Sequence, residues 1–370
     1  MSEIALTPKS NILITGVTGL IGGEILRCLL DREHLGQIWP LIRATTESPM
    51  HRLGVRFARS QDTREIPATV RAVNGDIQKP VWGMNATDAS TIRNDVDVIV
   101  HNAADTSFVA HRNTSDTNVE SVRQLIDFAK SCRRNPLVVY MGTASNVGDI
   151  SGCSVTEEDG CRAENRHYNE YTHSKAIAEN LLRESGLPLL TLRPSIVLSA
   201  DLADETFARQ ILWCAPLTRV FRALPLNPDA RLDLVDVGFV AAMSVRLMEH
   251  TNRTHDCYHL SAGKNYAITL GELGTLIDLH YGRRPLKLIT PAAWTPSDED
   301  KYVRTGVQRR VFRSLHHYLP FLNMDVTYES DRLRQDVGFE DAVPQPVVKY
   351  INKLLDIIPT KAAMKEAAVP

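Results

Sequence analysis

The chain of 370 residues is longer than one hydrophobic core usually supports, so we expect a large domain with a smaller one appended. Its charge is nearly balanced, with 42 lysines and arginines against 44 aspartates and glutamates, and the absence of a basic block argues against a nucleic-acid partner. Six scattered cysteines without CxxC spacing, no signal-peptide pattern and no apolar run of about 18 residues predict a cytoplasmic protein with no membrane span.

The first predicted elements are a strand and a helix joined by a glycine-rich turn. NILIT at 11–15 is typical of a short buried strand, and the apolar residues at 25–30 indicate a helix. Between them Gly16, Gly19 and Gly22 follow at three-residue spacing. In this setting the glycines permit the turn, the approach of a pyrophosphate and the packing of helix on strand. The pattern therefore predicts a dinucleotide site at the N-terminus of the helix.

The second predicted strand, IWPLI at 38–42, indicates which dinucleotide is bound. Pro40 suggests that this strand lies at an edge or starts irregularly. The strand ends on Arg43, where NAD-specific sites usually carry a carboxylate for the ribose 2′-hydroxyl and an arginine accommodates a 2′-phosphate. Arg43 thus favours NADPH. Arg52, in a helix expected near 47–60, is either a second phosphate ligand or a solvated helix arginine.

Strands and helices alternate over about the first two hundred residues. Further strands are predicted at 68–73 (running into the GDI of 75–77), 96–100, 137–141 and 189–193. This alternation predicts an α/β fold with a Rossmann-type, doubly wound parallel sheet. Beyond Pro194 the pattern becomes irregular and more helical. We therefore expect an NADP-binding domain at 1–200 and a smaller, mostly helical substrate domain at 201–370, with returns to the sheet within 230–262, at 232–235 and 258–260.

A tyrosine and a lysine four residues apart form the candidate catalytic pair. Tyr171 and Lys175, in YTHSK, share one face of a helix that ends before Leu187-Pro188. An ammonium beside a phenol favours the phenolate, so we expect Lys175 to lower the pKa of Tyr171 toward neutrality. The alternative is a chance pairing on an exposed helix.

A third catalytic group is expected where the strand at 137–141 ends, because open α/β sheets bind ligands at the carboxyl ends of their strands. Thr143 is the candidate donor to a substrate carbonyl, with Ser145 as a substitute; the alternative is a hydroxyl that only caps backbone groups. Small residues at 102–104, after the strand at 96–100, leave room for a cofactor at this edge. Asn118 is expected to cap a helix or to brace the catalytic backbone.

The assembled motifs resemble the extended short-chain dehydrogenase/reductase superfamily, over residues 10 to about 260. They are TGVTGLIGG, GDI, HNAAD, MGTAS, YTHSK and LRPSIV. Within it, LIRATTESPMHRL and RPSIV look most like the thioester reductase and fatty acyl-CoA reductase branch. The resemblance implies catalysis by Thr143, Tyr171 and Lys175. The candidate NADP(H) contacts are Thr15, Gly16, Thr18, Gly19, Leu20, Ile21, Gly22, Arg43, Arg52, Asp76, Ile77, Asn102, Ala103, Ala104, Asn118, Tyr171, Lys175, Pro194, Ser195 and Ile196.

The first functional hypothesis is NADPH-dependent reduction of an acyl thioester, carried on coenzyme A or an acyl carrier protein, to an aldehyde or alcohol. The alternatives are a reductase, dehydrogenase or epimerase of a small carbonyl, steroid-like or nucleotide-sugar substrate, and a non-catalytic NADP-binding sensor. The tyrosine–lysine pair argues against the sensor.

Three features of the C-terminal half are open to two interpretations. The apolar segment 206–226 is interpreted either as the lining of a channel for an acyl chain or pantetheine arm, or as part of the hydrophobic core. The second feature is a group of three arginines, which either dock an acidic carrier protein or form a solvated helix face: Arg309, Arg310 and Arg313. The group His250, His255, Cys257 and His259 straddles a helix end and a strand, so no metal site is expected there.

Overall fold

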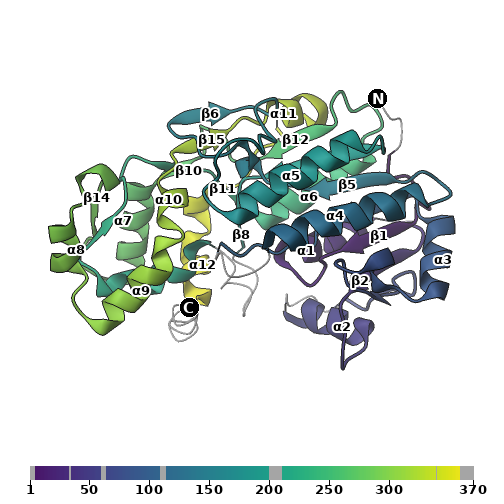
Figure 1. Cartoon of the computed structure of the whole chain (residues 1–370), viewed down its shortest axis with the longest axis horizontal. Helices are drawn as coiled ribbons and strands as arrows, with labels where there is room; N and C mark the ends of the chain where they lie inside the picture. The colour runs from purple at the N-terminus through teal and green to yellow at the C-terminus, as the bar shows by residue number, and fades with distance from the viewer. Residues whose placement is uncertain are drawn as a thin grey trace.

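A seven-stranded parallel sheet forms the centre of the computed structural model, which describes residues 5–32, 35–59, 64–108, 114–199, 211–338 and 340–358 (Figure 1). The strands are ordered β12-β7-β5-β4-β1-β2-β3. Their bounds are Ile12–Thr15 (β1), Ile38–Ile42 (β2), Val73–Asn74 (β3), Val98–His101 (β4), Leu137–Met141 (β5), Leu189–Pro194 (β7) and Cys257–Leu260 (β12). The order reverses between β1 and β4, which places the ligand crevice of such a sheet at the carboxyl ends of these two strands.

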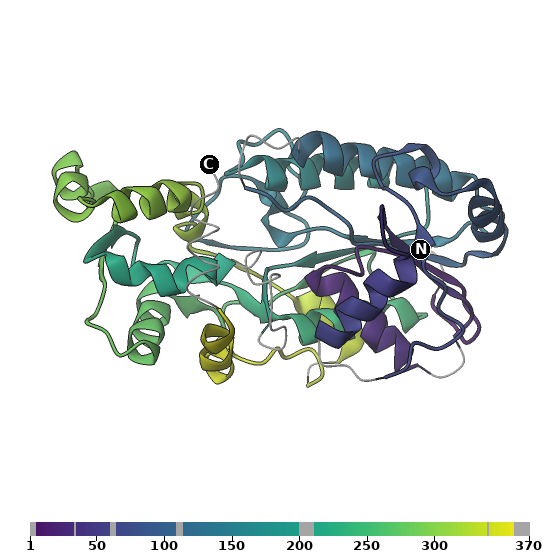
Figure 2. The same ribbon diagram turned by 90° about the horizontal axis from the view of Figure 1, so that it is seen from below.

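Helices cover both faces of this sheet. The helices α3 (Ala86–Asp95), α4 (Thr114–Lys130) and α5 (Glu170–Glu184) lie on one face, and α1 (Leu20–Leu30), α2 (Pro49–Arg59), α6 (Val237–Glu249) and α11 (Asp331–Val337) on the other. Figure 2 shows the blue and teal α4 and α5 on one side of the sheet and the purple α1 on the opposite side. Ile12 and Ile14 pack into one apolar cluster and Leu13 into the other, as expected for strands buried on both faces. The predicted doubly wound fold is confirmed.

The C-terminal part surrounds a second, smaller apolar core. Its strands form a four-stranded sheet, β13-β10-β15-β6, and two pairs, β8 with β11 and β9 with β14. Their bounds are Cys153–Val155 (β6), Ile196–Leu198 (β8), Ala223–Pro225 (β9), Arg231–Leu232 (β10), Leu234–Asp236 (β11), Ile268–Thr269 (β13), Lys287–Ile289 (β14) and Val326–Tyr328 (β15). The helices are α7 (Leu270–His280), α8 (Pro296–Tyr302), α9 (Gly306–His316), α10 (Leu319–Leu322) and α12 (Ile351–Ile357). Short 3-10 segments are η1 (Pro80–Gly83), η2 (Ala144–Val147), η4 (Ile211–Val220), η5 (Pro291–Ala293) and η6 (Val347–Lys349). Over the described ranges, every helix is too short or too polar to span a bilayer.

Three strand predictions need correction. The strand predicted at 68–73 is reduced to Val73–Asn74, because Val70 makes only an isolated bridge to Ile38 and regular pairing with β2 begins at Val73. The predicted return of 232–235 to the central sheet is also wrong, since these residues divide between β10 and β11, which pair elsewhere. The residues of β12, by contrast, do join the central sheet beside β7, where the sequence predicted a return at 258–260.

The third correction concerns Pro40, because β2 is not an edge strand but lies between β1 and β3. Ile38 makes both of its backbone hydrogen bonds to the segment 69–71 on the β3 side. Residues two apart in a parallel strand bond to the same neighbour, so the N–H that Pro40 lacks falls on that side as well. There the ladder is sparse: only Leu41 and Ile42 pair with β3. The strand tolerates proline because its second neighbour is so short.

The described part of the apolar segment 206–226 packs into the C-terminal core. Trp213 is 2% exposed and its neighbours in η4 are similarly buried. This placement favours the core-packing interpretation of 211–226. Residues 206–210 lie outside the described residues.

Candidate active site

The glycine turn between β1 and α1 packs tightly against the chain that follows β4 and against the start of α1. Gly16 has φ +76°, and a Cβ there would lie 2.8 Å from the Ala103 nitrogen. A Cβ on Gly22 would lie 2.4 Å from the Gly16 carbonyl oxygen, so this position must be glycine for the helix to pack on the turn. Gly19, directly before helix α1, provides no side-chain cap, and the first turn of the helix has no acidic residue. Its N-terminal N–H groups, around Thr18, Leu20 and Ile21, therefore form the kind of end that receives a pyrophosphate.

The hydroxyl of Thr15 ties the ends of β1 and β4 together at the crevice. It accepts hydrogen bonds from the backbone nitrogens of Asn102 (3.1 Å) and Ala103 (3.0 Å). The buried His101 ring lies 3.3 Å from the same hydroxyl and 3.3 Å from the Ser121 hydroxyl. Burial, and then the charge of Lys175, lower the pKa of His101 to about 3, so this ring is neutral. Ala104 follows on the same half-buried loop.

Two arginines meet at the carboxyl end of β2. Arg43 is exposed directly after the strand, and the Arg52 guanidinium, on α2, donates to the Arg43 carbonyl oxygen. Sequence reasoning placed both near a 2′-phosphate, and the structure brings them together. Further along this edge, Asp76 and Ile77 follow β3, with the Asp76 N–H donating to the Trp82 carbonyl at 2.7 Å.

Thr143, Tyr171 and Lys175 come together at the carboxyl end of β5. The Lys175 ammonium donates to the Met141 carbonyl at 2.7 Å and lies 4.7 Å from the centre of the Tyr140 ring. The Thr143 hydroxyl lies close enough to the Tyr171 phenol to lower its pKa. Lys175 is 3% exposed, so the helix face that carries the pair is not a solvated one. Residues 194–196 come from the end of β7 and the start of β8, with the Ser195 N–H donating to the Leu260 carbonyl at 3.2 Å.

The expectation that Lys175 lowers the pKa of Tyr171 is wrong for this structure. Burial raises the pKa of Tyr171 to about 12, and the nearby Thr143 hydroxyl only partly offsets it. Burial lowers the pKa of Lys175 to about 7, against the opposing effect of the Glu179 carboxylate. The ammonium is directed at Met141 and Tyr140 rather than at the phenol. Tyr171 is therefore a neutral hydrogen-bond donor across the working pH range, and Lys175 is the group that titrates near neutrality.

Polar contacts near the site distinguish between the two roles considered for Asn118 and between Thr143 and Ser145 as the hydroxyl beside Tyr171. Asn118 lies one turn inside α4 and does not cap it; its side chain holds the Asp105 backbone and donates to the Ser174 hydroxyl at 2.9 Å. It therefore braces the helix that carries the tyrosine and lysine. The Ser145 hydroxyl is 3.0 Å from the Tyr328 hydroxyl, so it is engaged with the C-terminal part. Of the two hydroxyls, Thr143 is the one directed at Tyr171.

Phe108 packs against Tyr171 and joins it to aromatic rings of the C-terminal part, a feature that the sequence analysis missed. The Phe108 ring stacks 6.1 Å from Tyr171 and 5.2 Å from Tyr318. Phe321 packs edge-on against Phe108 at 5.2 Å, and Trp213 edge-on against Tyr318 at 6.0 Å. Because Phe108 lies in a loop and the other rings belong to a distant part of the chain, no periodicity links them to Tyr171.

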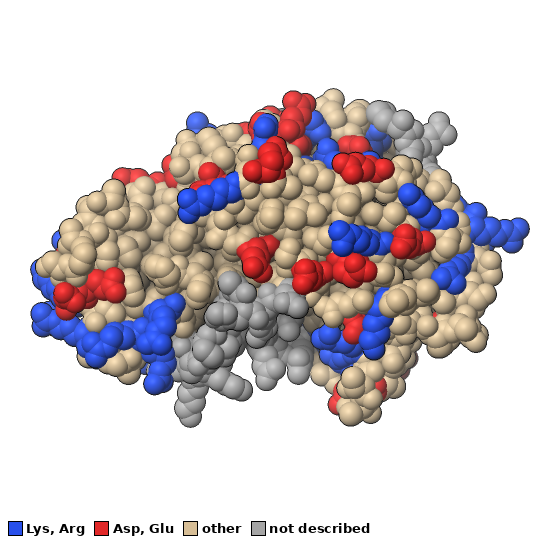
Figure 3. Space-filling view, in the orientation of Figure 1, with Lys and Arg blue, Asp and Glu red and all other residues tan. Residues whose placement is uncertain are grey.

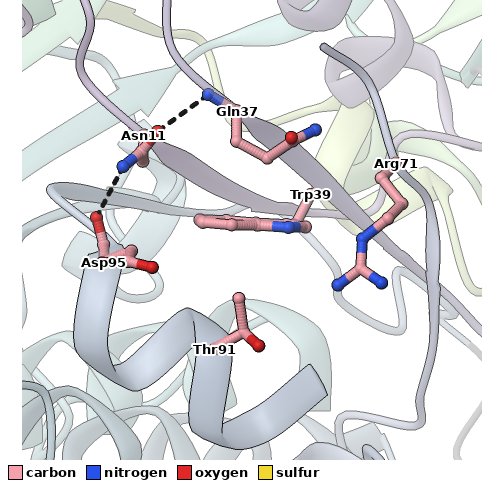
Figure 4. Close-up of a pocket in the computed structure, with 6 residues that line it drawn as sticks. All are labelled: Asn11, Gln37, Trp39, Arg71, Thr91 and Asp95. Atoms are coloured by element: carbon pink, nitrogen blue, oxygen red, sulfur yellow. Dashed lines mark hydrogen bonds between the residues drawn. The ribbon is translucent and has the colours of Figure 1, made fainter. Parts of the chain in front are cut away.

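A hollow of about 390 Å³ lies away from this site (Figure 4). It is lined by Asn11, Gln37, Trp39, Arg71, Thr91 and Asp95, near the amino ends of the strands. Asn11 there holds the Gln37 nitrogen and the Asp95 carbonyl, and Arg71 pairs with Asp88. The polar groups of this hollow serve structural contacts. In the described ranges no three His, Cys, Asp or Glu side chains are grouped to bind a metal ion.

Comparison with known proteins places this fold in a family. Residues 14–244 match the NAD-binding family described as male sterility protein. The chain belongs to this family. The match contains the end of β1, the glycine turn, Thr143, Tyr171 and Lys175.

Solved structures of similar shape include reductase domains of biosynthetic enzymes. The terminal R domain of the myxalamid PKS-NRPS pathway superposes with a TM-score of 0.77 at 22% identity, over 97% of this chain and 94% of that one. A reductase domain of a nonribosomal peptide synthetase from Mycobacterium tuberculosis gives 0.71 at 22% identity, over 96% and 95%. At these identities the likeness establishes the fold.

Similar sequences belong to longer proteins. A polyketide synthase-nonribosomal peptide synthetase of Aspergillus flavipes is 27% identical over 75% of this chain, which spans 7% of that protein. A Drosophila melanogaster protein named as a fatty acyl-CoA reductase is 24% identical over 84% of this chain, which spans 64% of it. This chain thus covers less than two thirds of the length of either relative.

Proposed function

We propose that this protein is an NADPH-dependent reductase of an acyl thioester, bound to coenzyme A or to a carrier protein, that produces an aldehyde or alcohol. The observation that carries the proposal is the meeting of Thr143, Tyr171 and Lys175 beside the glycine turn, in a chain of this NAD-binding family. We propose residues 1–200 as the cofactor part and 201–370 as the substrate part. All six cysteines are free, which supports our proposal of a cytoplasmic, reducing location.

The residues at the crevice fit NADPH. The uncapped N-terminus of α1 and the turn at Gly16 would hold the pyrophosphate, Arg43 and Arg52 the 2′-phosphate, and Lys175 the nicotinamide ribose. The walls of the cofactor site would be completed by the loop at 76–77, Asn102 to Ala104, Asn118 and residues 194–196. When bound, this cofactor supplies a hydride.

The chain's own groups then act on the substrate carbonyl. Tyr171 and Thr143 donate hydrogen bonds to the carbonyl oxygen as negative charge develops on it, and the neutral phenol delivers a proton. The hemithioacetal formed from a thioester collapses to an aldehyde and a free thiol. Because the pKa of Tyr171 is raised to about 12, the phenol stays protonated until this transfer.

Two observations support a thioester over other carbonyl substrates. The relatives and neighbours named above include reductase domains of carrier-based synthetases and a protein named as a fatty acyl-CoA reductase. Lys and Arg side chains also gather over α8 and α9 at one end of the molecule (Figure 3). On α9 the exposed Arg309, Arg310 and Arg313 lie opposite the buried Val311, Phe312 and Leu315. A basic face of this kind suits the acidic surface of a carrier protein or the phosphates of coenzyme A.

The test follows NADPH oxidation with three substrate panels: acyl-CoA thioesters, the same acyl groups on a carrier protein, and free ketones or nucleotide sugars. The proposal expects turnover with at least one thioester, and one free thiol for each NADPH oxidised if the product is the aldehyde or for every two if it is the alcohol. Activity on free carbonyls or sugars alone would transfer the assignment to a different reductase or epimerase.

Arg43→Ala is expected to weaken NADPH binding by about 1–3 kcal/mol and to leave NADH binding little changed, because it removes a charge-assisted phosphate contact. Titration of both cofactors into both proteins measures the difference. Arg71→Ala is the matched control, since this exposed arginine lines the hollow near the amino ends of the strands. Equal affinities of the parent for NADH and NADPH would refute the proposed preference.

A further inference from the structure

A fully buried carboxylate lies one helical turn beyond Lys175. Glu179, on α5, is 0% exposed and accepts hydrogen bonds from three different parts of the chain. Asn146 Nδ2 donates at 2.8 Å, Arg193 Nη2 at 2.6 Å and Arg183 Nε at 3.1 Å. Arg193 is itself fully buried and also donates through Nε to the same carboxylate.

These partners lie next to the residues of the candidate active site. Asn146 belongs to η2, three residues after Thr143. Arg193 is in β7, directly before the segment 194–196 that we assign to the cofactor wall. A Cβ on Gly142 would lie 3.3 Å from Glu179 Oε2, so the backbone between β5 and Thr143 passes close to the carboxylate. Glu179 is thus the point where the Thr143 turn, the Tyr171 helix and the end of β7 meet.

Stability alone does not account for this arrangement. The cost of removing two charges from water roughly cancels the attraction of a buried ion pair, and apolar packing of similar volume is often as stable. Hydrogen bonds are directional, so a hydrogen-bonded ion pair fixes the relative position of three segments more precisely than apolar side chains do.

We propose that Glu179 is a positioning residue for the reaction, acting through Asn146 on the Thr143 turn and through its negative charge on Lys175. This inference deepens the proposed function and rests on it for the identity of the reacting groups. Glu179 does not touch the substrate; it fixes the groups that do.

The charge of Glu179 bears directly on the protonation of Lys175. Burial lowers the pKa of Lys175 to about 7, and the carboxylate opposes that shift, so its removal should lower the pKa further. The other titratable groups that face this pair stay in one state near neutrality. The pKa of His101 is lowered to about 3, and those of Tyr171 and Cys257 are raised to about 12. Burial also raises the pKa values of Tyr140 and Cys161 well above their usual values. The pKa values of Arg183 and Arg193 are raised, so both stay charged. Among these groups of the protein, Lys175 is the one with a pKa near neutrality, and comparison with Lys175→Met separates its contribution to the midpoint from that of the cofactor's 2′-phosphate.

The test measures NADPH affinity against pH, and turnover at saturating cofactor, in the parent and in Glu179→Gln. The variant is expected to move the midpoint of the binding curve to lower pH and to reduce turnover by roughly ten- to a hundredfold, the effect of a small misplacement. The KM for the thioester should change little. Arg183→Gln is the control: this half-exposed arginine contacts the same carboxylate from the outside, and its variant should keep the parental midpoint and turnover.

Two further variants distinguish a positioning effect of Glu179 from a loss of folded protein. Glu179→Gln combined with Arg193→Met removes both buried charges and should show the same shift of the midpoint. Asn146→Ala removes the hydrogen bond between the Thr143 turn and Glu179, with a longer contact to the Cys161 sulfur, and leaves the charge of Glu179 in place. Turnover should therefore fall while the midpoint stays. A folded Glu179→Gln protein with parental midpoint and turnover, or an Asn146→Ala protein with parental turnover, would overturn the proposal. The binding curve needs no thioester, so a parent that reduces no thioester refutes the proposed function and leaves the effect of Glu179 on Lys175 to be judged separately.

Discussion

Tyr171→Phe is expected to bind NADPH as the parent does and to lose roughly a hundred- to ten-thousandfold in turnover, the effect of removing a positioned acid. The substitution deletes only the phenolic hydroxyl. The phenyl ring retains its stacking on Phe108, at 6.1 Å between centres, so the aromatic packing at the site stays. Single-turnover oxidation of bound NADPH by the best thioester measures the chemical step directly.

Tyr168→Phe provides the matched control for this prediction. Tyr168 is half-buried three residues earlier, and its hydroxyl donates to the Ile150 carbonyl at 2.9 Å. Removal of that hydroxyl costs about 1 kcal/mol of stability and should leave turnover intact. If Tyr171→Phe reduces the thioester at the parental rate, the phenol is not the proton donor.

Lys175→Met should have the second-largest effect, because it removes a group with two proposed roles. Methionine fills the same buried space beside Tyr140 but lacks the ammonium that would hold the nicotinamide ribose. We expect NADPH affinity at slightly acidic pH to fall by about 1.5–3 kcal/mol, the value of a charge-assisted hydrogen bond. Turnover should fall as well, since the cofactor loses its orientation.

The pKa of Lys175 determines whether the affinity for NADPH rises or falls with pH. Lys175 has a pKa of about 7 in the structure, and a bound cofactor that accepts its hydrogen bonds favours the charged form. Binding above that pKa therefore takes up a proton, and the affinity of the parent should decrease as the pH rises beyond about 7. Calorimetry in two buffers of different ionisation enthalpy detects the proton. A parent whose affinity is flat from about pH 6 to pH 9, like that of Lys175→Met, would contradict the assignment.

The parts of the site that the sequence predicted depend on local patterns. The glycine turn, the helix with Tyr171 and Lys175 and the strand that ends before Thr143 each lie within one short stretch of chain, so spacing and periodicity reveal them. The pKa of Tyr171 could not be foreseen, because it depends on burial by residues far away in sequence. The same holds for the Phe108 and Tyr318 rings and for Glu179, whose partners Asn146 and Arg193 come from separate elements.

The positions of β6 and β12 limit how this protein can be divided. Cys153–Val155 lies in the first half of the chain but pairs with β15, at residues 326–328, whereas Cys257–Leu260 lies in the second half but completes the central sheet beside β7. A cut near residue 200 would leave each half without a strand and expose unpaired edges prone to aggregation. The two halves are therefore expected to unfold in one cooperative transition. Exchange of substrate-binding parts between relatives would have to carry β6 with the second half and leave β12 with the first.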